Sequence, residues 1–150
     1  ARANALVPAG SAALLGGALL SQFVGGLFPC EMCYWQRWPH LAAIALGLLA
    51  WALGSNRALT ALAAIAVLVS GAIGVFHAGV EYHWWEGVTT CTAAPITGST
   101  SEVLGSIMAT PLIRCDAAQW TLFGISLAGY NAILSGLIGG GALWLLRKPR

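Results

Sequence analysis

Two cysteines stand between long apolar runs in the stretch FPCEMCYWQRWPH, residues 28–40. The spacing of Cys30 and Cys33 places both thiols within bonding reach at the start of a helix, where free N–H groups and the helix dipole stabilise a thiolate. A redox-active pair is therefore indicated. Zinc is the alternative, but it needs a second close pair of ligands, and Cys91 and Cys115 are far apart in the sequence. We expect no metal.

An arginine and a histidine continue from this pair along one helix face. If the helix begins near Cys30, then Cys33, Arg37 and His40 form a single stripe entering the membrane. Arginine just inside a membrane span is costly and needs a reason. One is snorkelling to the lipid headgroups. The other is that Arg37 stabilises the Cys33 thiolate and a lipid-soluble acceptor that becomes anionic as it takes electrons.

A second histidine lies near the outer end of the third apolar run. His77 could supply or orient a proton, with Glu81 one helical turn further on. A simple pairing of His77 with Glu81 is the alternative. Among electron acceptors a quinone fits best, because it dissolves in the bilayer and takes two electrons and two protons. We therefore expect Cys33, Arg37 and His77 to form a quinone site.

The elements that position these residues follow from composition. The chain has 150 residues, of which 58% are hydrophobic and 8% charged, and its mean hydropathy is +0.77. Crossing a bilayer takes roughly 20 apolar residues in a helix, because lipid cannot satisfy free backbone groups. We predict an all-α membrane protein, a single domain over residues 1–150 that forms a four-transmembrane-helix bundle. The expected spans are residues 5–27, 34–53, 58–80 and 120–146.

The distribution of charge predicts the orientation. Positive residues concentrate on one side of the predicted spans and all five acids on the other, so the positive-inside rule places both termini in the cytoplasm. Topology explains the basic residues, so no nucleic-acid partner is expected. A short loop, 28–33, and a long loop, 81–119, then face the periplasm and hold every cysteine, which indicates an oxidising compartment. In the long loop, Ser99 to Glu102 has the spacing of a helix capping box.

Three segments together resemble one known family over nearly the whole chain. They are PCEMCYWQRWPH, HAGVEYHWWEGVTTC and CDAAQWTLFGISLAGYN, and they are similar to the disulfide bond formation protein B (DsbB) family. These are quinone-linked oxidases of the bacterial inner membrane that recharge a periplasmic thiol oxidase, DsbA. The resemblance implies a DsbA-like partner, electron transport to the membrane quinone pool (ubiquinone or menaquinone), and a position in the lipid bilayer.

The resemblance also implies a role for each cysteine. Reduced DsbA attacks Cys91, the released Cys115 attacks Cys30, and Cys33, freed as a thiolate, passes electrons to the quinone beside Arg37. Two other classes remain as alternatives. Vitamin K epoxide reductase-like enzymes also join a Cys-x-x-Cys to a quinone, although there the motif typically comes late in the chain. A four-helix scaffold with two structural disulfides is the non-enzymatic alternative.

Overall fold

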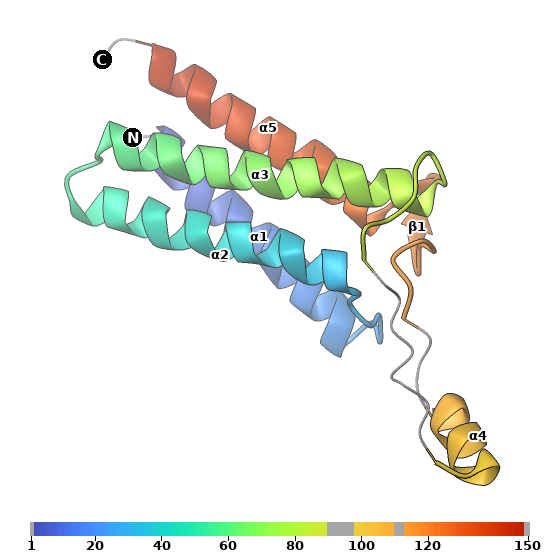
Figure 1. The fold of residues 1–150 in the computed structure, drawn as a ribbon. Coiled ribbons are helices and arrows are strands. Elements are labelled where there is room, and N and C mark those ends of the chain that lie inside the picture. Colours follow the sequence, from blue (N-terminus) through green and yellow to red (C-terminus); the bar gives the residue numbers. More distant parts are fainter. Residues whose placement is uncertain (1, 90–97, 110–112, 149–150) are drawn as a thin grey trace.

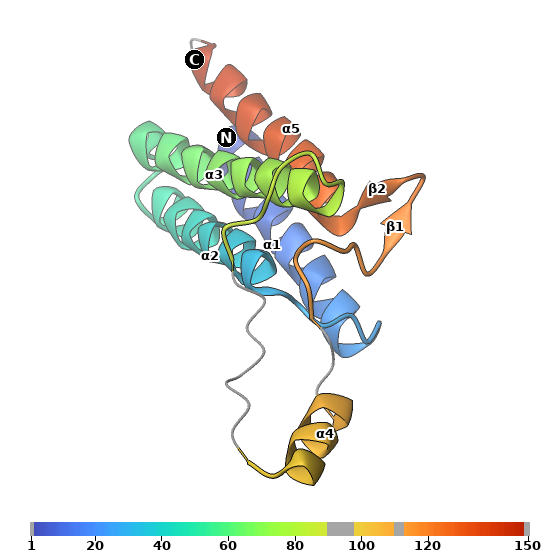
Figure 2. The same ribbon diagram turned by 45° about the vertical axis from the view of Figure 1, so that its right-hand side comes forward.

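A computed structural model describes residues 2–89, 98–109 and 113–148. Four long helices run roughly antiparallel as a bundle (Figure 1): α1 (Arg2–Phe23), α2 (Glu31–Ala52), α3 (Arg57–Glu81) and α5 (Leu127–Arg147). Helix α3 packs on both α2 and α5, and α1 packs on α2 and α5. The short α4 (Thr100–Ala109) lies away from the bundle in both views (Figures 1 and 2). The prediction of a mostly helical protein is confirmed.

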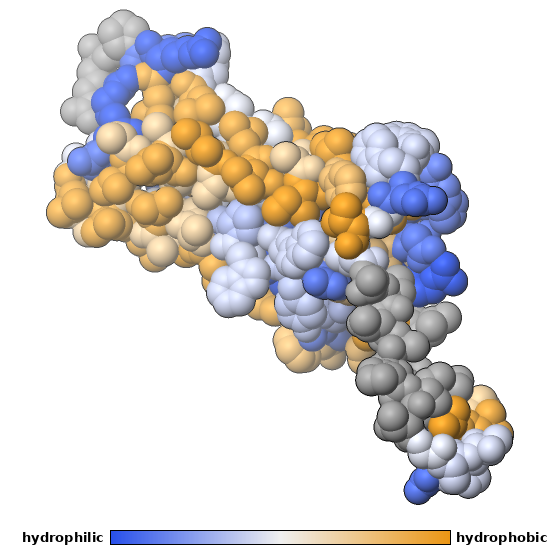
Figure 3. Space-filling view, in the orientation of Figure 1, coloured by the Kyte–Doolittle hydropathy of each residue, from blue (hydrophilic) through white to orange (hydrophobic). Residues whose placement is uncertain are grey.

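Three of these helices, α1, α3 and α5, are long and apolar enough to cross a membrane. Helix α2 has 22 residues, but its first turns carry polar side chains and it does not belong to that group of described helices. The span expected at residues 34–53 therefore stays a prediction. Large apolar side chains cover much of the outer surface of the helices, whereas hydrophilic residues gather toward their ends (Figure 3). That distribution suits a bilayer as solvent.

Two helices have ends that differ from the approximate limits expected for the membrane spans. The first helix ends at Phe23 rather than at residue 27, and Gly26 follows it with a φ of +68°. The last helix begins at Leu127 rather than at residue 120, because a two-stranded hairpin of β1 (Thr121–Leu122) and β2 (Ile125–Ser126) precedes it (Figure 2). The two loop residues of the hairpin, Phe123 and Gly124, both have positive φ. Two-residue hairpin loops of type I′ require this backbone conformation.

The helix starts have identifiable caps. The Asn56 side chain accepts hydrogen bonds from the N–H groups of Ala58 and Leu59, which fixes the start of α3. Ser126 does the same for α5 through the N–H of Gly129. The capping box predicted for α4 is confirmed, since a Glu102 carboxylate oxygen accepts from the N–H of Ser99 at 2.9 Å. The Cys30 side chain makes no such bond at the start of α2, so its sulfur is available for other contacts.

Small residues allow the helices to approach closely. A Cβ atom at Gly74 would lie 3.0 Å from the backbone oxygen of Ala128, so α3 and α5 touch almost backbone to backbone there. At the other end of the bundle a buried hydrogen bond of 2.7 Å runs from the Thr60 hydroxyl to the Asn4 amide oxygen. Side chains at the close α3–α5 contact are therefore held firmly, and the functional residues lie next to it.

Candidate functional site

The thiol pair lies where the sequence predicts it, at the beginning of a helix. Cys30 is the N-cap of α2 and Cys33 is in its first turn. Both are free cysteines, and the Cys30 thiol donates a hydrogen bond of 3.2 Å to the Cys33 sulfur. This bond raises the pKa of Cys30 to about 12, with burial adding to the effect. The same bond lowers the pKa of Cys33, which precedes the predicted span. Cys33 is therefore the thiol that ionises first.

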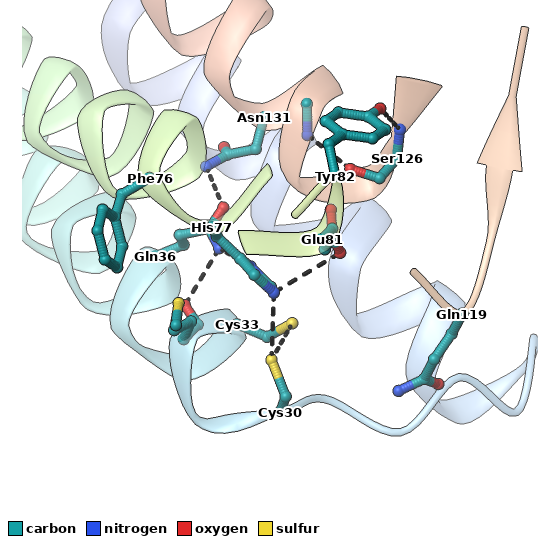
Figure 4. A network of polar contacts seen from close by, with 12 residues as sticks. Cys30, Cys33, Gln36, Phe76, His77, Glu81, Tyr82, Gln119, Ser126 and Asn131 are labelled. Atoms are coloured by element: carbon teal, nitrogen blue, oxygen red, sulfur yellow. Dashed lines mark hydrogen bonds and ion pairs between the residues drawn. The ribbon is translucent and has the colours of Figure 1, made fainter. Parts of the chain in front are cut away.

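His77 and Glu81 face this pair from α3 (Figure 4). The Nε2 atom of His77 is 3.5 Å from the Cys30 sulfur and 3.6 Å from a carboxylate oxygen of Glu81. The sequence left two interpretations open, a partner for the redox site and a simple pairing with Glu81. The structure shows both contacts on one nitrogen. The other carboxylate oxygen of Glu81 is buried and has no hydrogen-bond partner among the described residues.

A third cysteine completes the cluster. Cys115 is 5% exposed and packs in one buried group with Cys30, Met32 and Val80. Burial raises the pKa of the Cys115 thiol. The long loop therefore brings one of its two predicted cysteines to the Cys-x-x-Cys pair. Cys91, the other, lies outside the described residues.

Arg37 follows Cys33 by one helical turn, as predicted, and its partners come from two helices. Its Nη1 atom donates a 2.7 Å hydrogen bond to the Gln22 amide oxygen of α1, and its guanidinium lies 5.1 Å from the centre of the Tyr34 ring. No carboxylate pairs with Arg37 among the described salt bridges. Its positive charge is thus held by neutral groups and remains available to an anion.

A cavity of about 300 Å³ opens between the helices at this point. Apolar side chains of α1 and α5 form much of its wall. The polar and sulfur-containing side chains that line it include Cys30, Cys33, Arg37, His77 and Glu81. His40 also lines it, and the His40 Nδ1 atom is buried with no described partner. A cavity with apolar walls and a few convergent polar groups is the usual form of a small-molecule site.

Sequence reasoning missed two amides that join the helices behind the site. Gln36 of α2 hydrogen-bonds the Nδ1 atom of His77 at 2.8 Å, and Asn131 of α5 donates to the Gln36 amide oxygen at 2.8 Å. Their one sequence signal is a polar amide inside an otherwise apolar helix, which marks an internal contact in a membrane protein. Helical spacing alone did not show which helix supplies the partner.

The structure also gathers a set of metal-ligand atoms that the sequence did not predict. The ligand atoms of Cys30, Cys33 and His77 lie within 4.8 Å of one another. A metal-bound histidine, however, normally donates its second ring N–H to an acceptor. Here the Gln36 amide nitrogen faces that second ring atom. The arrangement therefore favours thiol chemistry over metal binding.

Apolar membrane helices that hold two adjacent thiols and a third buried cysteine beside a cavity define a membrane protein of thiol–disulfide chemistry. Comparison with known proteins agrees with this class. The family model described as disulfide bond formation protein DsbB matches residues 1–145. The chain belongs to the DsbB family.

Curated relatives carry the same description. A disulfide bond formation protein B of Polaromonas naphthalenivorans (strain CJ2) is 31% identical, over 98% of this chain and 91% of the relative. One from Verminephrobacter eiseniae (strain EF01-2) is 29% identical, over 92% and 81%. An uncharacterised protein of Rickettsia prowazekii (strain Madrid E) is 24% identical, over 81% and 73%. No solved structure matches the chain significantly.

Proposed function

We propose that this protein is a membrane thiol:quinone oxidoreductase that reoxidises a periplasmic DsbA-like dithiol oxidase. The observation that supports this most directly is the shared cavity, because one space between membrane helices is bordered by the Cys30–Cys33 pair, by Arg37 and by His77. A quinone bound there accepts two electrons and two protons and carries them into the membrane pool.

The DsbA-like oxidase, the carrier, exchanges its dithiol with the four cysteines in successive steps. A thiolate of the reduced carrier attacks Cys91 in a Cys91–Cys115 disulfide, and Cys115 leaves as a thiolate. Cys115 then attacks Cys30, the Cys30–Cys33 bond breaks, and Cys33 leaves as a thiolate. The second carrier thiol attacks the mixed disulfide and releases the oxidised carrier, with Cys91 leaving as a thiolate. Cys91 then attacks Cys115, which re-forms the Cys91–Cys115 disulfide and breaks the Cys115–Cys30 bond, with Cys30 leaving as a thiolate. Cys30 and Cys33 are left with the carrier's two electrons. Transfer of these electrons, with two protons, to a bound quinone would re-form the Cys30–Cys33 disulfide.

The geometry supports this direction of transfer. Thiolates of lower pKa leave more readily in disulfide exchange. Because the pKa of Cys33 is lowered by its contact with Cys30, Cys33 is the better leaving group when Cys30 is attacked. Cys115 packs in the same buried cluster as Cys30, so the attacking sulfur has a short path.

The residues present fit a quinone. Arg37, which pairs with no carboxylate among the described residues, supplies a positive charge where negative charge develops on the acceptor. His40 Nδ1 and one Glu81 oxygen are buried polar atoms without described partners in the same wall, as expected where a ligand supplies the missing contacts. The apolar walls of α1 and α5 would hold the ring and its tail.

The proposal includes the bacterial inner membrane, α2 as the fourth span, and an orientation with the cysteines periplasmic and both termini cytoplasmic. Helix α2 packs within the bundle beside α1 and α3. Gln36 contacts His77 of α3, Arg37 contacts Gln22 of α1, and His40 lines the cavity. Membrane helices tolerate buried polar residues in such positions. A vitamin K epoxide reductase-like enzyme remains the less favoured alternative, because here the Cys-x-x-Cys lies early in the chain, at the start of the second long helix.

Binding of quinone provides the test. Protein purified in mild detergent is extracted with organic solvent, and the extract is analysed by mass spectrometry for ubiquinone and menaquinone. Leu134→Trp narrows the cavity from α5 and should lose the quinone. Leu137→Trp is the control, because Leu137 is 67% exposed and does not line the cavity. Absence of quinone from the parent protein, or equal retention in both variants, would reject the proposed site.

A further inference from the structure

The amide pair Gln36–Asn131 determines which nitrogen of His77 carries the proton. The argument begins at Asn131, whose amide nitrogen is 3.2 Å from the backbone oxygen of Ser70. A backbone oxygen only accepts hydrogen bonds, so this end of the Asn131 side chain is its NH₂ group. The Ser70 hydroxyl agrees, because it donates to the Gln36 backbone oxygen at 2.8 Å and can only accept from Asn131 at 3.1 Å.

The Gln36 amide is fixed from both of its ends. Its oxygen accepts from the Asn131 NH₂ group at 2.8 Å, and its nitrogen donates to the backbone oxygen of Met32 at 3.1 Å. The Gln36 NH₂ group therefore also faces His77, 2.8 Å from Nδ1. Because that group can only donate, Nδ1 must hold a lone pair. In the neutral ring the proton is then on Nε2.

The Nε2 atom faces the Cys30 sulfur at 3.5 Å and a Glu81 oxygen at 3.6 Å, and both can accept a hydrogen bond. His77 is 2% exposed, so little of the ring is open to bulk water. We infer that Gln36 and Asn131 are positioning residues, which hold His77 as a neutral Nε2–H donor directed at the Cys30 sulfur (Figure 4).

The sequence suggested that His77 could supply or orient a proton, and this arrangement limits what the ring can do. A ring held with a bare Nδ1 against an N–H group cannot take a second proton there without losing the Gln36 contact. His77 can therefore stabilise negative charge on Cys30 when that sulfur becomes a thiolate, and its Nδ1 atom does not relay protons to the acceptor. The inference rests on the proposed thiol chemistry for its purpose, but the position of the proton is a property of the bundle itself.

His40 provides an internal reference for the tautomer of His77. Asn131 presents its oxygen to His40 Nε2 at 2.9 Å, so His40 is also an Nε2–H tautomer. Among the described hydrogen bonds none joins Gln36 to His40, whereas Asn131 contacts both Gln36 and His40. A change at Gln36 should therefore alter His77 alone, and a change at Asn131 should alter both histidines. The exposed His83 supplies the signal of an unconstrained ring.

The direct test is nitrogen NMR of the histidine rings in the reduced full-length protein, reconstituted in lipid nanodiscs. In the parent, His77 and His40 should each show a protonated Nε2 and a bare Nδ1, while His83 shows the average of exchanging tautomers. Gln36→Met, which keeps the size but removes the donor, should release His77 and leave His40 fixed. Gln36→Glu should place a proton on Nδ1 of His77. A parent His77 protonated on Nδ1 would overturn the inference.

A second measurement follows the reactivity of the Cys30 sulfur. In a Cys33→Ala background, Gln36→Met should slow alkylation of Cys30 at one fixed pH by roughly ten- to a hundred-fold, the effect of one hydrogen bond to a charged group. Glu81 and Cys115, the other titratable groups near this sulfur, are unchanged.

Ser135→Ala is the matched control, because it removes a contact to the Asn131 oxygen without touching Gln36. Equal alkylation rates in the Gln36→Met and Ser135→Ala proteins would contradict the role of Gln36. A parent protein that shows the expected histidine tautomers but does not reduce quinone would reject the proposed function and leave this inference standing.

Discussion

The two thiols of the pair have different states because one donates a hydrogen bond to the other. Cys30 keeps its proton and Cys33 accepts from it, so the pKa of Cys30 rises and that of Cys33 falls. A residue with a lowered pKa is a thiolate at any pH above that pKa. Cys33 is therefore the sulfur of the pair that more readily carries negative charge, and electrons leave through it.

Removing the donor should reverse this state. In Cys30→Ala the Cys33 thiolate loses its principal stabilising contact, so the pKa of Cys33 should rise and its alkylation near neutral pH should slow by about ten-fold. Mass spectrometry of the Cys33 peptide after timed exposure to iodoacetamide measures this. Cys115→Ala is the control that keeps the Cys30 donor. Faster alkylation in Cys30→Ala would show that Cys30 shields Cys33 instead of activating it.

Arg37 gives a second prediction at this scale. Arg37→Leu leaves every thiol in place, so disulfide exchange with the carrier should continue while quinone reduction falls by about 10²–10³, as for loss of a donor to a developing anion. Arg37→Lys should recover part of the rate, because it keeps the charge but loses the planar fork. Rates of quinol formation and of carrier oxidation are measured separately. A near-parental rate in Arg37→Leu would make the residue a snorkelling anchor.

At the scale of elements, the site depends on the close approach of α3 and α5. Gly74 lies one turn from Ser70 and faces the Ala128 backbone, so this contact positions the network that holds His77. Gly74→Ala should lower the unfolding free energy by about 1–3 kcal/mol through overpacking. Thermal unfolding in detergent measures the change. Gly136→Ala is the control, because a Cβ there meets no atom within 4 Å, and it should be neutral or stabilising. Equal melting temperatures would argue against a tight interface.

Sequence reasoning recovered the helices better than their limits. Apolar runs predict helices because lipid forces internal hydrogen bonding, and this holds for α1, α3 and α5. The same apolarity hid the hairpin before α5, where the sequence TLFGIS is as hydrophobic as the span it adjoins. Only Gly124 signalled a turn, and positive φ at Phe123 is a tertiary outcome that its residue type does not announce.

At the scale of the whole molecule, the predicted site residues do converge. Cys30, Cys33, Arg37 and His77 border one cavity although they come from two helices. The sequence spacing predicted that Arg37 lies one helical turn after Cys33, because both residues belong to one helix. It could not identify Gln22, Gln36 or Asn131, since contacts between helices depend on the rotation and register of the packed bundle, which periodicity within one helix does not determine.

The proposed orientation of the bundle gives a prediction of its own. In a protein whose native cysteines are replaced by serine, Glu86→Cys should react with an impermeant maleimide added to the periplasmic side, whereas Lys148→Cys should react only after the inner membrane is opened. Both positions are exposed, so burial does not limit labelling. The opposite pattern would place the redox cluster in the cytoplasm and remove the oxidising compartment from the account.

The central claim is that electrons from a carrier dithiol leave through Cys33 to a quinone in the cavity. The most direct measurement is the stoichiometry of one coupled reaction, with purified protein in nanodiscs, a reduced DsbA-like carrier and an added quinone. The account predicts one quinol formed per carrier disulfide in the parent protein. It predicts no quinol in Cys33→Ser, although the carrier still forms a mixed disulfide with Cys91. Carrier oxidation without quinol formation in the parent, or undiminished quinol formation in Cys33→Ser, would contradict it.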